Sequence, residues 1–203
     1  CCGYIAHLVG VEKDFKECQS KVAEFISKIK PQQLVTTCAG CYRTFKQLYP
    51  EQFFDSIRLT HSVEFVEELI RNGKIRFSAQ SSKKVAYHDP CDLGRHSGVF
   101  EPPRNILRQI PGIELIEFES NRMNAACCGG GGGYKAVNIE KSLEVASKRV
   151  EAVANLGAEV IVSACPSCKS SLQVAAAKGR KEGKWKIRVM DITEFVAQAM
   201  SQA

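Results

Sequence analysis

The spacing of the ten cysteines constrains this chain more than any other feature of its sequence. The gap from Cys2 to Cys38 holds 35 residues, and the gap from Cys128 to Cys165 holds 36. Each half therefore carries an adjacent pair followed by a CxxC pair, which indicates an internal repeat with a period of about 127 residues. The full set is Cys1, Cys2, Cys18, Cys38, Cys41, Cys91, Cys127, Cys128, Cys165 and Cys168.

The second copy of the repeat has one additional cysteine. Cys91 stands 35 residues ahead of the second adjacent pair and has no counterpart in the first half. We therefore expect two homologous units, residues 1–80 and 81–203, with the start of the first unit missing and the SAQSS segment at 78–82 as linker. The alternative is an N-terminal cysteine exposed by removal of a leader or carrying a lipid, which the matching pair in the second half disfavours.

Hydrophobic periodicity assigns the same elements to both halves. Apolar residues recur every three or four positions over 11–30 and from Ile139 to Val153, which predicts an amphipathic helix in each unit. A short β-rich run follows each helix, at 34–37 and 160–163, and leads into a CxxC pair. Beyond the cysteines, 57–66 and 187–196 align with each other, and each is typical of a strand that runs into an N-capped helix.

The second half adds further elements before its adjacent cysteines. Strands are predicted at 84–87 and 113–118, with a short helix at 103–110 between them. Alternating strands and helices predict an α/β fold built from two homologous α/β units, with ligands bound at the loops that follow the strands.

Composition excludes several classes of protein. Hydrophobic residues make up 44% and charged residues 25%, which are ordinary values for a globular chain. No apolar run approaches the ~18 residues that a membrane-spanning helix needs, so we expect no membrane span. The net charge of +6 does not require a nucleic-acid partner. The basic segment 178–188 is predicted to be a solvated turn, with docking of an acidic partner or an anionic coenzyme as the alternative.

Three kinds of cysteine chemistry compete for these motifs. Disulfides suit small secreted scaffolds, whereas this chain has long amphipathic helices and a core. Structural zinc uses four ligands, whereas the complete second motif offers five. Adjacent thiolates diverge and are awkward ligands for one tetrahedral ion, but they can reach different irons of a cluster. The pattern therefore favours an iron–sulfur cluster.

The residues around the cysteines support this interpretation. Five glycines at 129–133 follow the second adjacent pair, and their freedom of φ would let amide N–H groups point at sulfur. An ordinary flexible linker is the alternative. Both CxxC pairs, CAGC at 38–41 and CPSC at 165–168, are predicted at helix N-termini, whose partial positive charge lowers the thiol pKa. A thioredoxin-like redox pair is the alternative, but it needs no adjacent pair 36 residues earlier.

With HDPC at 88–91, CCGGGGG at 127–133 and CPSC at 165–168, the sequence resembles the cysteine-rich CCG domain of heterodisulfide reductases, in their D-like and B-like types. The resemblance implies non-cubane 4Fe-4S clusters, one or two per chain, that reduce a mixed disulfide of thiol coenzymes. It assigns one cluster to Cys91, Cys127, Cys128, Cys165 and Cys168, which are also the predicted catalytic residues. It assigns the other to Cys1, Cys2, Cys38 and Cys41.

The resemblance also implies partners and a location. A chain of this family is expected to work with other redox subunits (ferredoxin-like, cytochrome b or flavin) in the cytoplasm, or at the membrane through a partner. An electron-transfer subunit of a membrane-associated or 2-hydroxy-acid dehydrogenase complex is the alternative function, and a zinc-stabilised interaction module is a third. One departure from the family pattern is Asp92, which stands where the HDPCHLGR segment of relatives carries His.

For several other residues, a structural role is the alternative to a functional one. His88, Asp89, Arg95 and His96 flank Cys91; either histidine could donate to cluster sulfur or deliver a proton, and loop hydrogen bonding or N-capping is the simpler interpretation. Cys18 is predicted to be a small buried apolar residue of its helix. His61 and its repeat counterpart Asp191 are predicted to be helix caps.

Overall fold

The structure is a computed structural model that describes residues 1–78 and 82–200. Its strands form two parallel sheets, one of two strands in the order β1-β2 and one of four in the order β4-β3-β5-β6. Their bounds are β1 Gln33–Thr36, β2 Arg58–His61, β3 Lys83–His88, β4 Ile113–Ile116, β5 Val160–Ser163 and β6 Arg188–Asp191.

The first half is mainly helical around its small sheet. Helix α2 runs from Glu12 to Ile29, as the periodicity predicts, and its apolar face includes the buried Phe15 and Ile26. Its other α-helices are α1 Tyr4–Leu8, α3 Ala39–Gln47 and α4 Ser62–Arg71, with a 3₁₀ turn η1 at Glu51–Phe54.

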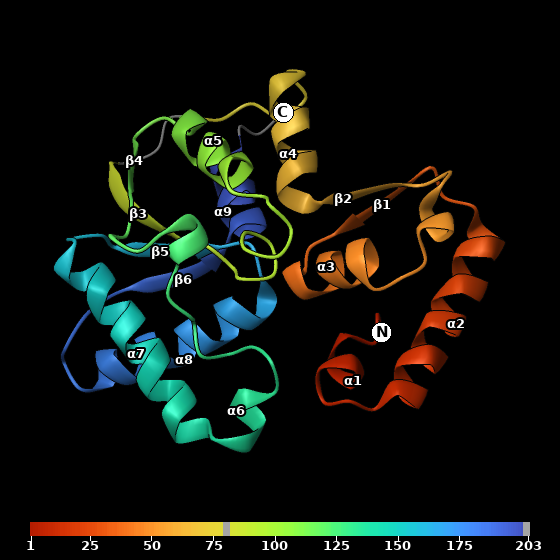
Figure 1. Cartoon of the computed structure of the whole chain (residues 1–203). Helices are drawn as coiled ribbons and strands as arrows, with labels where there is room; N and C mark the ends of the chain where they lie inside the picture. Colours follow the sequence, from red (N-terminus) through yellow and green to blue (C-terminus); the bar gives the residue numbers. More distant parts are fainter. Residues whose placement is uncertain (79–81, 201–203) are drawn as a thin grey trace.

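In the second half, α7 and α8 pack against each other, and α5 and α9 pack against α4 of the first half. Figure 1 shows the first-half elements in red to yellow beside the larger sheet, with α3 and α4 nearest to it. The bounds are α5 Glu101–Gln109, η2 Arg122–Asn124, α6 Tyr134–Val137, α7 Ile139–Asn155, α8 Pro166–Lys181 and α9 Ile192–Ala199.

The repeat is visible in the order of elements. The series β1, α3, β2, α4 of the first half recurs as β5, α8, β6, α9 in the second. His61 accepts a hydrogen bond from the N–H of Val63 at the start of α4, and Asp191 accepts one from Thr193 at the start of α9. The predictions of an α/β fold, of an internal repeat and of these two caps are confirmed.

The central strands of the larger sheet form the core. All four residues of β5 are buried, as are the last four of β3, because helices cover both faces of a parallel sheet. Strand β5 has the predicted bounds, whereas β4 ends at Ile116, two residues earlier than expected. The predicted boundary between 1–80 and 81–203 lies at 79–81, outside the described residues, and stays a prediction. Of the described helices, none combines the length and the apolar character that crossing a membrane requires.

Candidate metal centre

Cysteines follow three strand ends. Cys38 comes two residues after β1, Cys91 three residues after β3, and Cys165 two residues after β5. The carboxyl ends of parallel strands share one edge of a sheet, so β3 and β5 bring their two cysteines to the same edge. Cys38 and Cys165 are also the N-cap residues of α3 and α8, which confirms that both CxxC pairs lie at helix N-termini.

The second motif forms a compact buried group. Cys128 and Cys168 are 4% and 3% exposed, and their sulfur atoms lie within 4.8 Å of each other and of a ring nitrogen of His88. Cys127 and Cys128 share a hydrogen bond, as do Cys165 and Cys168. Cys91 lies at the side of this group, partly buried, where it interacts electrostatically with Cys128.

The first motif forms a second group. Cys41 shares hydrogen bonds with both Cys2 and Cys38, and Tyr49 donates to the carbonyl of Cys2 at 3.2 Å. Cys1 is exposed and lines, with Cys2 and Cys41, an apolar groove of about 320 Å³ between α2 and β1. The structure therefore places every first-motif cysteine around one site.

The two groups touch. The side chains of Cys38 and Cys165 share a hydrogen bond, although these residues belong to different halves of the chain. Hydrogen bonds thus link the sulfurs of both motifs in a single row, which we call the cysteine row: Cys2, Cys41, Cys38, Cys165, Cys168, Cys128 and Cys127. Cys1 and Cys91 lie beside this row, and none of the ten cysteines, all within the described residues, forms a disulfide.

Hydrogen bonds within the row lower the pKa of particular thiols. Cys165 and then Cys41 donate to the sulfur of Cys38, which lowers its pKa to about 2. Cys127 and Cys168 lower the pKa of Cys128 in the same way, and Cys41 lowers that of Cys2 to about 6. Thiolates are therefore present in both groups at neutral pH, which is the ionisation state that binds metals.

The glycine loop contributes donors to sulfur, as the sequence predicts. The N–H of Gly129 lies 3.2 Å from the sulfur of Cys127, and that of Gly130 lies 3.5 Å from the sulfur of Cys128. Gly129 has φ of +76°, and a Cβ there would lie 2.4 Å from the carbonyl oxygen of Ser142. This position therefore requires glycine for its conformation and for its close contact with α7.

The donor set fits an iron–sulfur cluster. It consists of soft thiolate ligands with amide donors aimed at their sulfurs, which is typical of zinc or iron–sulfur sites. The second motif alone offers five cysteines, one more than a tetrahedral zinc binds. A cluster would be held at the second motif by Cys91, Cys127, Cys128, Cys165 and Cys168.

The polar residues that flank Cys91 differ in burial and in whether they contact the cysteines. His88 is 1% exposed and shares a hydrogen bond with Cys128, whereas His96 is exposed. Arg95 donates to the carbonyls of Met123 and Ala125, and so holds the segment that leads to Cys127. Cys18, predicted to be buried, is only partly buried; its Cβ faces Gly3, which has no side chain to cover it.

Two further polar contacts are not indicated by any local sequence pattern. Asp92 accepts hydrogen bonds from Tyr4 and Arg43 of the first half, at 2.7 and 2.9 Å. The fully buried Arg104 donates to Asp89, at 2.7 and 2.8 Å, and to Glu117. The only signal for the first contact is the departure of Asp92 from the family pattern.

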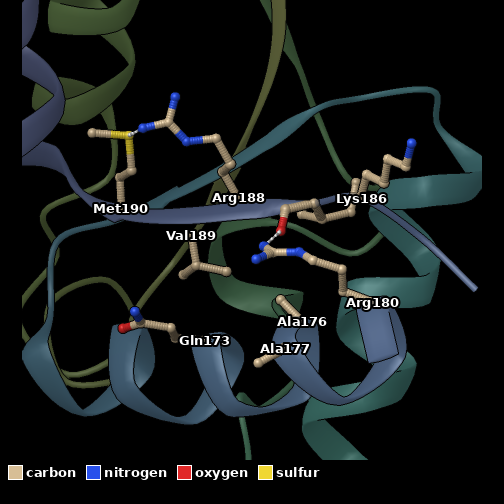
Figure 2. A pocket seen from close by; sticks show the side chains of 9 residues that line it. Gln173, Ala176, Ala177, Arg180, Lys186, Arg188, Val189 and Met190 are labelled. Atoms are coloured by element: carbon tan, nitrogen blue, oxygen red, sulfur yellow. Dashed lines mark hydrogen bonds between the residues drawn. The ribbon is translucent and has the colours of Figure 1, made fainter. Parts of the chain in front are cut away.

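One cavity lies away from the cysteines. It holds about 590 Å³ between the second part of α8 and β6. Figure 2 shows Gln173 and Ala177 on α8 opposite Val189 on β6, with the side chains of Arg188 and Met190 on the other side of that strand. Arg180 donates to the backbone carbonyl of Ile187. No cysteine lines this cavity, so it contributes nothing to the thiol chemistry of the row.

Comparisons with known proteins agree with the site. The model of the cysteine-rich domain named CCG matches residues 1–46 and 85–173, which contain both motifs. The D-type subunit of a dihydromethanophenazine:CoB–CoM heterodisulfide reductase from Methanosarcina acetivorans is 38% identical over 98% of this chain, and the match covers 49% of that relative. The chain thus spans about half the length of such relatives.

Two other relatives have different names. A probable iron–sulfur-binding oxidoreductase, FadF, of Bacillus subtilis is 33% identical over 95% of the chain and 27% of the relative. A probable membrane-anchored ferredoxin of Chromohalobacter salexigens is 30% identical over 98% of the chain and 30% of the relative. Both names support the expected iron–sulfur chemistry, and the predicted membership of an oxidoreductase family is confirmed. The chain belongs to the family of cysteine-rich CCG-domain proteins.

Proposed function

We propose that this chain is the cluster-binding part of an iron–sulfur oxidoreductase of the heterodisulfide reductase type, which reduces a mixed disulfide of two thiol coenzymes. Non-cubane 4Fe-4S clusters would be held by the two groups of cysteines. The ligands of one are Cys91, Cys127, Cys128, Cys165 and Cys168, and those of the other include Cys1, Cys2, Cys38 and Cys41. When bound, the clusters supply electrons one at a time.

The observation that carries this proposal is the contact between Cys38 and Cys165. Reduction of a disulfide consumes two electrons and two protons and yields two thiols, so it needs two one-electron carriers close together or one carrier used twice. The contact joins the two ligand groups at their CxxC pairs, and the first group also opens on an apolar groove. A substrate bound beside Cys38 and Cys165 would lie within reach of both groups of cysteines.

The partners follow from the chemistry. The electrons must enter from a donor, so we expect a ferredoxin-like, cytochrome b or flavin subunit to dock near the cysteine row. A cytoplasmic chain, or one held at the membrane through such a partner, suits this role. The name of the membrane-anchored relative is consistent with the second arrangement.

Turnover measurements test the proposal. The anaerobically prepared chain with its clusters is mixed with a heterodisulfide and reduced viologen dye, and dye oxidation is followed. We expect Cys168→Ser, which removes a buried sulfur of the row, to abolish the rate. Cys18→Ser is the matched control, because Cys18 lies outside the row, and it should keep the wild-type rate. No rate above background with full clusters would reject disulfide reduction.

The second candidate is an electron-transfer subunit, and the ferredoxin name of one relative favours it. Such a chain would bind the same clusters and exchange electrons only with protein partners. Its reduced clusters would be reoxidised rapidly by a flavin or quinone acceptor and slowly by the heterodisulfide. The two candidates therefore differ in which oxidant rapidly reoxidises the reduced clusters.

A further inference from the structure

Helix α7 carries a buried arginine, Arg149, that contacts His88, and His88 in turn contacts the second group of cysteines. Arg149 is 5% exposed, and its guanidinium carbon lies 3.3 Å from the ring centroid of Phe118. Its Nη atoms donate to the hydroxyl and carbonyl of Ser120, at 3.4 and 3.2 Å, and its Nε donates to Nδ1 of His88 at 3.3 Å. Among the described residues, 1–78 and 82–200, no carboxylate lies within ion-pair distance of it.

Arg104, the other buried arginine among the described residues, has the carboxylate partners that Arg149 lacks. Arg104 is 0% exposed and is neutralised by two carboxylates, Asp89 and Glu117, each at 2.7 Å. A buried charge is costly unless a counter-charge or metal site accompanies it. Burial lowers the pKa of Arg149 to about 10, so its side chain stays a cation at neutral pH. Asp89 and Cys128 act on Arg149 electrostatically, but no described carboxylate forms an ion pair with it, so its charge lacks the direct counter-ion that Arg104 has.

His88 connects this cation to the cysteines. It is 1% exposed, and because its Nδ1 accepts from Arg149, the proton of the neutral ring must be on Nε2. His88 also shares a hydrogen bond with Cys128, and its ring nitrogen lies within 4.8 Å of the sulfurs of Cys128 and Cys168. The tautomer set by Arg149 is thus the one that donates from Nε2 to the sulfur of Cys128.

We propose that Arg149 and His88 form a buried positive support for the cluster at the second motif, with Arg149 as a positioning residue that acts through His88. The arginine holds the histidine in its donating tautomer, and the pair offsets the negative charge of thiolates and cluster. Positive charge and hydrogen bonds to sulfur stabilise the reduced form, so the support raises the reduction potential. This inference rests on the proposed cluster at Cys91, Cys127, Cys128, Cys165 and Cys168.

The measurement is an anaerobic redox titration of the cluster followed by electron paramagnetic resonance. We expect Arg149→Met to lower the potential enough to change the ratio of reduced to oxidised cluster at least ten-fold, which corresponds to about 59 mV for one electron. Arg149→Lys, which keeps the charge, should recover part of the shift. Lys148→Met is the matched control, since it removes the same charge from the neighbouring position of α7 and should leave the potential unchanged.

Unfolding of the cluster-free chain distinguishes this role from a purely structural one. Without the cluster, Arg149 is a buried cation that forms no ion pair with a described carboxylate, so Arg149→Met should cost little stability. Arg104→Met should lower stability with or without the cluster, because it removes the buried ion-pair partner of Asp89 and Glu117 and leaves them only their contacts with Arg122. If Arg149→Met no longer binds the cluster although its cluster-free fold is intact, the result supports the inference more strongly than a shift in potential does.

Three results would overturn the inference. An unchanged potential in Arg149→Met would show that the cation does not act on the cluster, and a fall in cluster-free stability like that of Arg104→Met would show a structural role. Strong nitrogen hyperfine coupling from labelled His88 would make it an iron ligand in place of a donor to sulfur. Absence of iron from the wild-type chain would instead refute the proposed function from which this inference starts.

Discussion

Asp92 provides the sharpest test of how the two halves are held together. Its carboxylate is 12% exposed and accepts from Tyr4 at 2.7 Å and from Arg43 at 2.9 Å, both in the first half. The loop that carries it makes a further contact with α3, where Lys46 donates to the carbonyl of Ser97 at 3.1 Å. The side chain next to Cys91 therefore binds the helix that begins with the first CxxC pair.

The cost of removing this carboxylate can be estimated from its two bonds. Hydrogen bonds to a charged group contribute about 1.5–3 kcal/mol each, and Asp92→Ala leaves both donors without their partner. We expect a loss of about 3–5 kcal/mol, which is a large part of a typical stability of about 5–15 kcal/mol. Arg43→Met alone should cost about 1.5–3 kcal/mol, because Arg43 is already 23% exposed.

A double-mutant cycle measures the coupling directly. Urea unfolding of the cluster-free chain, under reducing and anaerobic conditions, gives the free energies of the wild type, Asp92→Ala, Arg43→Met and the double variant. The account predicts that the double variant is more stable than additivity implies by about 1.5–3 kcal/mol. Additivity within about 0.5 kcal/mol would refute a direct Asp92–Arg43 interaction.

Two further predictions concern single positions. Gly129→Ala forces φ of +76° on an alanine and places its Cβ 2.4 Å from a backbone oxygen, so we expect a loss of about 2–3 kcal/mol in urea unfolding; wild-type stability would mean that the loop can move aside. Burial lowers the pKa of His61 to about 4, so the folded state resists protonation, and stability should fall as the pH drops from 6.5 towards 4, by about 3 kcal/mol at most. Because His61→Asn keeps the cap but does not titrate, its stability should decline less over that range, and parallel pH curves for variant and wild type would contradict the assignment.

The cysteine motifs and the elements around them could be predicted because their signals are local. The spacing of adjacent and CxxC pairs, the helical periodicity over 11–30 and the β-branched run at 160–163 are all short-range patterns. Most of the predicted strands and helices agree with the observed bounds to within one or two residues, since periodicity defines which face of an element is buried. The assignment of these cysteines as cluster ligands stays a prediction.

The polar contacts around the site could not be predicted from the sequence, because they join residues that lie far apart in it. Tyr4 and Asp92 are separated by 88 residues, and Arg149 and His88 by 61. The sequence does contain one signal for such a contact. Arg149 lies between Ala146, Val150 and Val153 on the apolar face of its helix, and a cation on such a face indicates a buried charge with a specific partner.

The central claim is that the second motif binds an iron–sulfur cluster, and metal analysis of the anaerobically purified chain tests it most directly. Iron, acid-labile sulfide and zinc are measured per chain in the wild type, in Cys168→Ser and in the control Cys18→Ser. The account predicts about four iron for the cluster of the second motif, and up to about eight if the first site is filled, with about four lost in Cys168→Ser and none in Cys18→Ser. A colourless chain that contains zinc and no iron would contradict it.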